Sequence, residues 1–218
     1  MSELVLLSNP RVADLPAQDC GEPLVDLRTI GELVLDDRQA DPAGAYVHLR
    51  AGVVERLLVA QGHLPVGLRL LIVEAYRPLW LQEQYFEEYA NALRADNPTW
   101  SDAEVRVQAS RYISPPEIAP HVSGAAVDLT LCTETGEELQ MGTEVNASPE
   151  ESDNACYTNA PGISLSARYN RRLLSHALGT AGLVNYPTEW WHWSYGDRYW
   201  AMLTGAPAAV YGPQDLHL

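Results

Sequence analysis

Lysine is absent from this sequence of 218 residues, and all 14 basic residues are arginine. Without lysine, the chain has no residue for Schiff-base or lysine-nucleophile catalysis. It also cannot form a P-loop, which needs a lysine on the bound phosphates. A cationic catalytic group in this protein must therefore be an arginine, a histidine or a metal ion.

Positive charge as a whole is scarce, because the formal net charge is -15. Nucleic acids and anionic membranes are bound by stretches rich in lysine and arginine. A net-acidic chain without such a stretch argues against both partners. We therefore expect neither nucleic acid nor a membrane as a partner.

Cysteines and long apolar runs are also few. The three cysteines, Cys20, Cys132 and Cys156, are widely spaced and form no CxxC pair. This spacing favours neither a disulfide framework nor a thiolate zinc site. No apolar run approaches the roughly 20 residues of a membrane helix, and the N-terminus lacks the basic start of a signal peptide. We expect a cytoplasmic protein.

The pattern of apolar residues predicts helices and strands that alternate irregularly. Helical spacing or capping signals mark four segments, which are residues 45–60, 79–93, the segment from 101, and 164–180. Short apolar runs predict strands at 68–75, 125–131, 183–185 and 191–195. Residues 132–162 are rich in polar residues and glycine, so we expect a long loop. No domain boundary stands out, and we expect one α+β domain over residues 1–218.

The first candidate site combines His121 with Asp128, which lies in the predicted strand 125–131. Strand alternation places Asp128 on one face, among apolar neighbours, and a buried carboxylate must be paired, protonated or bound to a metal. Gly124 allows a sharp turn that brings His121 back beside Asp128. Two interpretations remain open at this point, a metal site and a structural His–Asp hydrogen bond.

A second candidate site is the segment Thr188–Trp193, in which Glu189 and His192 lie among three tryptophans. In a regular strand, Glu189 and His192 would face opposite sides. Both can reach one site only if Glu189 lies in a turn after Pro187. The alternative is an aromatic edge of the core with one satisfied histidine. We expect the tryptophans, Trp191 included, to form core and pocket wall.

A third candidate is Arg77, which precedes Pro78 at the end of the predicted strand 68–75. Proline favours an extended conformation for the residue before it, so Arg77 can project from the strand end into a cleft. An ordinary surface ion pair is the alternative interpretation.

Taken in order, the motifs EAYRP, HxxGxAxD and EWWH resemble those of the vancomycin-resistance-type D-alanyl-D-alanine dipeptidases, a family of zinc metallopeptidases. The resemblance includes further short matches and covers about residues 24–195. It implies a mainly antiparallel central sheet flanked by helices. It also implies one zinc ion per chain, held by His121, Asp128 and His192.

The same resemblance implies roles for two more residues. Glu189 matches the general base, which takes a proton from water and passes it to the leaving amine. Arg77 matches the arginine that stabilises the oxyanion of the tetrahedral intermediate. The implied activity is zinc-dependent hydrolysis of a peptide or amide bond in a small dipeptide-like substrate.

Departures from the family pattern concern recognition of the substrate's N-terminus. The family's serine, aspartate and tyrosine, which help to hold the substrate ammonium group, are replaced here by Ala119, Asn146 and Thr29. We therefore expect a catalytic centre of the family type with altered recognition of the substrate N-terminus. Another acid, Glu144 or Glu150, could replace the lost carboxylate.

Two other functions remain open on the sequence alone. One is a zinc-stabilised binding domain without catalysis, which would be expected to have lost Glu189 or Arg77. The other is a carboxypeptidase acting on cell-wall peptides, which would normally require export.

Overall fold

The computed structural model describes residues 4–216. Its centre is a five-stranded sheet with the strand order β2-β4-β5-β7-β6. The strands are β2 (Val34–Leu35), β4 (Leu68–Glu74), β5 (Ala126–Thr133), β7 (His192–Ser194) and β6 (Val184–Asn185). Only the β2–β4 pair is parallel. The expected mainly antiparallel sheet within an α+β domain is confirmed.

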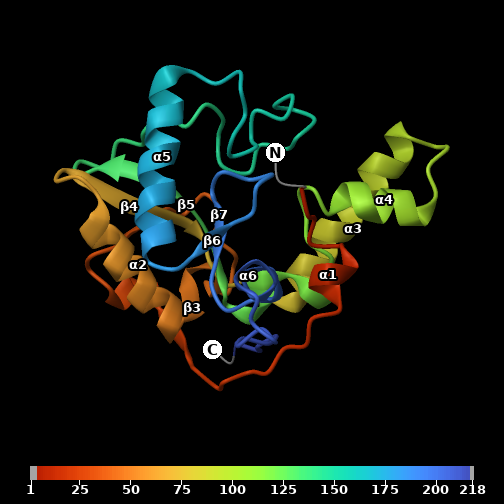
Figure 1. The fold of residues 1–218 in the computed structure, drawn as a ribbon, viewed down its shortest axis with the longest axis horizontal. Helices are drawn as coiled ribbons and strands as arrows, with labels where there is room; N and C mark the ends of the chain where they lie inside the picture. The colour runs from red at the N-terminus through yellow and green to blue at the C-terminus, as the bar shows by residue number, and fades with distance from the viewer. Residues whose placement is uncertain (1–3, 217–218) are drawn as a thin grey trace.

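Helices cover the sheet and extend beyond it (Figure 1). They are α1 (Pro10–Ala13), α2 (Ala51–His63), α3 (Leu79–Asp96), α4 (Asp102–Ala109), α5 (Leu165–Thr180) and α6 (Arg198–Thr204). A separate two-stranded sheet pairs β1 (Leu24–Asp26) with β3 (His48–Arg50). None of the helices within residues 4–216 has the length and apolar character needed to cross a membrane.

The main core lies between the sheet and the helices α2 and α5, which stand side by side (Figure 1). Val127, Leu129 and Leu131 of β5 are fully buried in it. Because side chains alternate along a strand, Asp128 points to the opposite face, away from these helices. The strand therefore separates the hydrophobic core from the face on which a polar site can form.

Helices α3 and α4 form a hairpin on the other side of the molecule from α2 and α5 (Figure 1). They pack through a small core of their own, centred on Phe86, Leu93 and Val105. The predicted capping signal at the start of α4 is confirmed, because Ser101 and Glu104 make both hydrogen bonds of a capping box. This hairpin supplies one wall of the site described below.

The helix expected at residues 45–60 is interrupted: Ala45–Val47 form a short 3-10 helix, and the α-helix begins only at Ala51, so the prediction was wrong for residues 48–50. Residues His48–Arg50 instead form β3, which pairs with β1. The fully buried Arg50 donates hydrogen bonds to the carbonyls of Glu22, Ser123 and Gly212. These tertiary bonds need an extended backbone at Arg50, and they override the helical spacing of nearby apolar residues.

The long loop expected after β5 is confirmed, since no helix or strand lies between Thr133 and Leu165 in this described stretch. It is held in place by Arg171 of α5. The Arg171 guanidinium donates hydrogen bonds to the carbonyls of Met141, Ala155 and Tyr157. One buried side chain thus fixes the path of a segment that lacks regular backbone pairing.

Candidate active site

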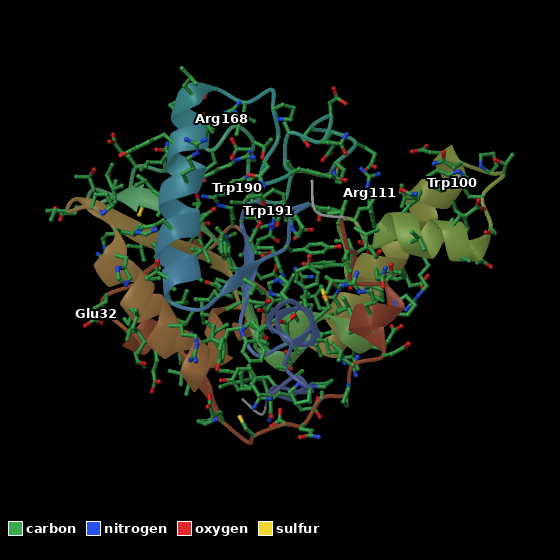
Figure 2. The ribbon with its side chains drawn as sticks, in the orientation of Figure 1. Glu32, Trp100, Arg111, Arg168, Trp190 and Trp191 are labelled. Atoms are coloured by element: carbon green, nitrogen blue, oxygen red, sulfur yellow. The ribbon has the colours of Figure 1, made fainter. Side chains whose placement is uncertain are left out.

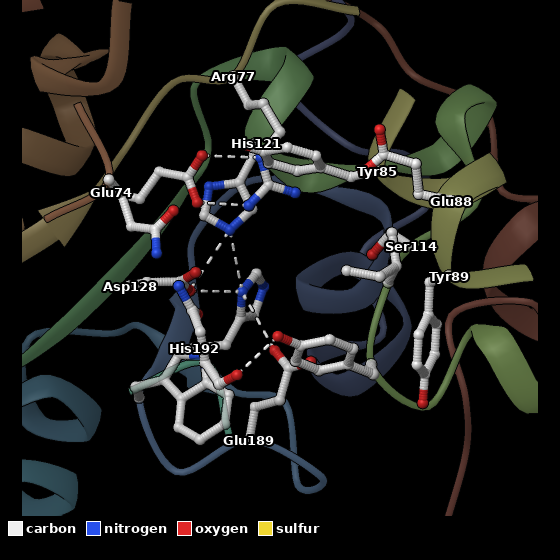
Figure 3. Close-up of a pocket in the computed structure, with 15 residues that line it drawn as sticks. Glu74, Arg77, Tyr85, Glu88, Tyr89, Ser114, His121, Asp128, Glu189 and His192 are labelled. Carbon is white, nitrogen blue, oxygen red and sulfur yellow. Dashed lines mark hydrogen bonds and ion pairs between the residues drawn. The ribbon is translucent and has the colours of Figure 1, made fainter. Parts of the chain in front are cut away.

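Three buried side chains, His121, Asp128 and His192, converge on one point of the sheet (Figure 3). Asp128 Oδ1 lies 2.9 Å from His192 Nδ1 and 3.4 Å from His121 Nε2. The two histidine nitrogens are 3.2 Å apart. The three atoms therefore form a small triangle, and each can act as a metal ligand.

Local backbone features bring these residues together. In the sheet register, Asp128 is the partner of His192 on one side and of Glu74 on the other. His121 lies in a 3-10 turn, Pro120–Ser123, that ends at Gly124 with φ 65°. This left-handed backbone favours glycine, and a Cβ atom at Gly124 would lie 2.3 Å from a side-chain carbon of Leu24, which would have to move. The expected turn at Gly124 is confirmed.

The donor set fits a zinc ion. A tetrahedral zinc with bonds of about 2.0–2.1 Å places its ligand atoms about 3.3–3.4 Å apart, close to the separations seen here. His121 Nδ1 lies 2.6 Å from the carbonyl oxygen of Ala75. Donation of the Nδ1 proton to that carbonyl leaves the Nε2 lone pair directed at the centre of the triangle.

The charge state of the cluster also suits a cation. Burial alone would raise the pKa of Asp128, but the neighbouring His121 and His192 outweigh it and hold that pKa well below its usual value. Burial lowers the pKa of His121, and the Asp128 carboxylate more than reverses this effect. An ionised carboxylate facing two imidazoles needs a positive charge between them, either a proton or a metal.

Glu189 lies beside the cluster, in the turn that follows Pro187. Its backbone N–H donates to the carbonyl of Tyr186, and its Oε2 is 3.7 Å from His192 Nδ1. The expected turn, which lets both residues reach one site, is confirmed. Burial, together with the charge of Asp128, raises the pKa of Glu189 well above its usual value. A carboxylate with a raised pKa can both accept and return a proton near neutral pH.

Arg77 projects into the same space, and it is buried rather than on the surface. Its Nε donates to Glu74 Oε1 at 2.8 Å, and its Nη2 bonds to Glu74 Oε2. Its Nη1 donates to Gln82 Oε1 at 2.8 Å, while Gln82 is held by the carbonyl of Ser114. Glu74 and Gln82 thus fix the guanidinium plane in the orientation shown in Figure 3.

These residues lie in an open cavity of about 410 Å³. The metal-ligand cluster and Glu189 occupy one wall, and Tyr85, Glu88 and Tyr89 of α3 face them across it (Figure 3). The volume is in the range of small-molecule sites. The cavity is large enough for a substrate of dipeptide size.

The four substrate-pocket candidates divide into two pairs. Asn146 and Trp191 line the cavity. Thr29 and Ala119 do not line the cavity. The exposed Thr29 turns its hydroxyl back onto the carbonyl of Asp26, at 2.7 Å. Ala119 is buried beside a separate small hollow next to Tyr211.

Neither acid considered as a substitute for the lost carboxylate lines the cavity either. Glu150 accepts hydrogen bonds from the Tyr89 hydroxyl and from Arg111, while Glu144 lies in a different surface hollow. Glu88 of α3, by contrast, is a lining acid that sequence reasoning missed. Its spacing from Tyr85 and Tyr89 matches one face of a helix, which is the signal that could have identified it.

Glu74, Gln82 and Tyr112 were also missed by sequence reasoning. Glu74 stands in the EAYRP motif, but nothing in the sequence indicates that it holds Arg77. Tyr112 lines the cavity and donates its hydroxyl proton to the carbonyl of Asn146 at 2.6 Å. Burial and the nearby Glu189 raise the pKa of Tyr112, so it stays protonated.

A buried His–Asp–His cluster next to a glutamate with a raised pKa and a fixed arginine is an arrangement typical of metal-dependent hydrolases. Comparison with known proteins agrees with this class. The profile of peptidase M15, described as D-ala-D-ala dipeptidase, matches residues 34–204. The chain belongs to this family, and it is a metallopeptidase.

Individual relatives carry the same description. A D-alanyl-D-alanine dipeptidase of Synechocystis sp. is 30% identical over 219 residues, covering 86% of this chain and 87% of the relative. A D-alanyl-D-alanine dipeptidase of Escherichia coli (strain K12) is 30% identical over 126 residues, covering 58% of this chain and 54% of the relative.

Two solved structures are also similar. One is a mutant of the vancomycin-resistance D,D-pentapeptidase VanY in complex with Zn(II), with 16% identity, a TM-score of 0.42, and coverage of 89% of this chain and 92% of that one. The other is VanYB in complex with D-alanine-D-alanine, with 18% identity, a TM-score of 0.43, and coverage of 80% and 93%.

Proposed function

We propose that the protein is a zinc-dependent hydrolase that cleaves the peptide bond of a small, dipeptide-like substrate. The main support is the convergence of three ligand atoms, at 2.9–3.4 Å from one another, on the wall of a cavity that also holds Glu189. One zinc ion per chain would be held by His121, Asp128 and His192. It would supply a Lewis acid for the scissile carbonyl and lower the pKa of the attacking water.

The other side chains of the cavity have distinct tasks in this reaction. Glu189 takes a proton from the attacking water and delivers it to the leaving amine. Its raised pKa suits both steps. The Arg77 guanidinium, fixed by Glu74 and Gln82, offers N–H groups to the negative charge that develops on the carbonyl oxygen. These donors are held in place before the substrate binds.

Recognition of the substrate's N-terminus is proposed to differ from that of the usual family members. Asn146 gives the cavity wall a neutral amide where the family has a carboxylate, and its backbone φ of 65° is one that asparagine and aspartate both tolerate. Loss of a charge partner for a desolvated ammonium costs about 2–5 kcal/mol of binding. We therefore propose a substrate with an N-acylated or otherwise altered N-terminus.

Turnover of D-alanyl-D-alanine and of its N-acetylated form by the zinc-loaded protein tests this proposal. We expect the acetylated substrate to have the higher kcat/KM. A strong preference for the free dipeptide would contradict the altered recognition but not the hydrolase activity. If the protein keeps its zinc and cleaves neither substrate nor longer peptides, it is a binding domain and the proposed activity is wrong.

A further inference from the structure

A second, smaller pocket lies between α5 and residues 158–163. Its volume is about 90 Å³, room for about three water molecules at about 30 Å³ each. Arg168, Arg171, Arg172 and Ser175 of α5 line it. Their spacing places them on one face of the helix, and Figure 2 shows Arg168 beside the upper, N-terminal turns of α5.

The charge in this pocket is uncompensated. The lining residues, all within the described part of the chain, include three arginines and no acid. No carboxylate in residues 4–216 forms an ion pair with Arg168, Arg171 or Arg172, although the chain carries 29 acidic residues and 14 basic ones. Three cations close together repel one another, so an anion between them would relieve the repulsion.

The arginines also have donors left over. Arg171 is buried, and its three nitrogens each donate to a carbonyl, which leaves two of its five N–H groups. Burial without a carboxylate lowers its pKa to about 10. Arg168 uses Nη2 for the carbonyl of Pro161, but its buried Nε has no partner. The side chain of Arg172 makes no hydrogen bond or ion pair with residues 4–216.

We propose that this pocket binds a small oxyanion of the phosphate class, held by Arg168, Arg171 and Arg172. A tetrahedral oxyanion accepts several hydrogen bonds at once and matches the planar N–H pairs of guanidinium groups. Ser175 adds a hydroxyl donor to the same wall. The volume admits a phosphoryl group and leaves the rest of a larger molecule in solvent.

The pocket is connected to the loop that carries Glu189. The backbone N–H of Thr158 donates to the carbonyl of Pro187, and the Thr158 hydroxyl bonds to Asn185. Asn185 in turn donates to the carbonyl of Glu189 at 2.9 Å. Arg171 lies 5.4 Å from the ring centre of Trp190, which is on the same loop. The proposed site is separate from the catalytic cavity and stands independently of the proposed reaction.

Calorimetric titration of the zinc-loaded protein with inorganic phosphate at constant ionic strength tests the proposal. Arg172→Gln and Arg168→Gln remove pocket donors, and Arg172 has no bond whose loss would disturb folding. Arg69→Gln is the matched control. It removes one arginine that also lacks a carboxylate partner and donates only to the carbonyl of Gly31, outside the pocket.

We expect phosphate to bind the unmodified protein and Arg69→Gln equally, and to bind each pocket variant at least tenfold more weakly. Equal binding by all four proteins would place the phosphate elsewhere, for example on the metal, and would overturn the proposal. Absence of binding to the unmodified protein at millimolar phosphate would do the same. The anion could be a free phosphate ion or the phosphoryl group of a larger molecule, and titration with glycerol phosphate distinguishes these two ligands. Tighter binding of glycerol phosphate than of phosphate supports a phosphorylated molecule, and weaker binding supports the free ion.

Discussion

The ion pair between Glu74 and Arg77 is the interaction whose removal we expect to change both stability and catalysis. Glu74 is 2% exposed and Arg77 8% exposed. Two charge-assisted hydrogen bonds join them. Glu74→Ala leaves the Arg77 guanidinium buried without its counter-charge. Breaking a buried pair in this way costs about 3–5 kcal/mol.

The effect on stability follows from the size of the protein. For a domain of this size, 1 kcal/mol corresponds to a shift in Tm of about 2–4 °C, so Glu74→Ala should lower the Tm by about 6–20 °C. Calorimetry of the zinc-loaded protein measures this shift. Glu134→Ala, which removes an exposed carboxylate elsewhere, should change the Tm little.

The effect on catalysis comes from the loss of a fixed oxyanion donor. With Glu74→Gln, one acceptor oxygen remains, so we expect a smaller loss of stability than with alanine. The Arg77 side chain is then held less firmly, and kcat should fall by up to about 10²–10³, the effect of losing an oxyanion donor. An unchanged Tm and an unchanged kcat in both variants would refute the reasoning.

Three further predictions concern single residues. Glu189→Gln keeps the shape of the base but cannot accept a proton, so kcat should fall by about 10²–10⁴ while metal analysis still finds zinc; full activity would exclude Glu189 as the base. Asn146→Asp restores a carboxylate to the cavity wall and should raise kcat/KM for a free dipeptide relative to its N-acetyl form by about tenfold or more, since about 1.4 kcal/mol is tenfold. An unchanged ratio would show that position 146 does not contact the substrate N-terminus. Desolvation raises the pKa of Asp19, but backbone N–H groups and Arg50 outweigh this effect and lower that pKa below its usual value. The resulting stabilisation is complete above the ordinary aspartate pKa of about 3.9 and is lost as the pH falls from there through the lowered value. Asp19→Asn should therefore lower the Tm at neutral pH, and the difference should disappear in acid; a constant difference at all pH values would contradict it.

The elements around the site could be predicted from the sequence because local rules decide them. Strand alternation placed Asp128 on the face opposite the core, and Gly124 supplied the turn that returns His121 to it. The turn after Pro187 was predictable because a regular strand would place Glu189 and His192 on opposite faces, so the two residues could share a site only if Glu189 lay in a turn. In each case the geometry spans only a few residues along the chain.

Features that depend on distant contacts could not be predicted in this way. The pairing of β1 with β3 turned residues 48–50 of an expected helix into a strand, because Arg50 bonds to carbonyls far away in sequence. The same holds for Glu74, whose position beside Asp128 is fixed by the register of β4 and β5. A motif gives the order of such residues but not their neighbours in space.

Whether a residue lines the cavity also depends on distant contacts, so the sequence alone could not predict it. Matching the family pattern singled out Thr29, Ala119 and Asn146 alike, yet only Asn146 lines the cavity. Whether Thr29 and Ala119 contact a bound substrate remains a prediction. The Thr29 hydroxyl is engaged with the carbonyl of Asp26, a contact that no sequence pattern indicates.

The central claim is that His121, Asp128 and His192 hold one zinc ion on which hydrolysis depends. The most direct measurement combines metal analysis with turnover, before and after chelation, for the unmodified protein and for Asp128→Asn. We predict one zinc per unmodified chain, loss of activity on chelation, recovery with one equivalent of zinc, and neither stoichiometric zinc nor recovery in Asp128→Asn. Turnover that persists in the metal-free protein, or stoichiometric zinc in Asp128→Asn, would contradict the account.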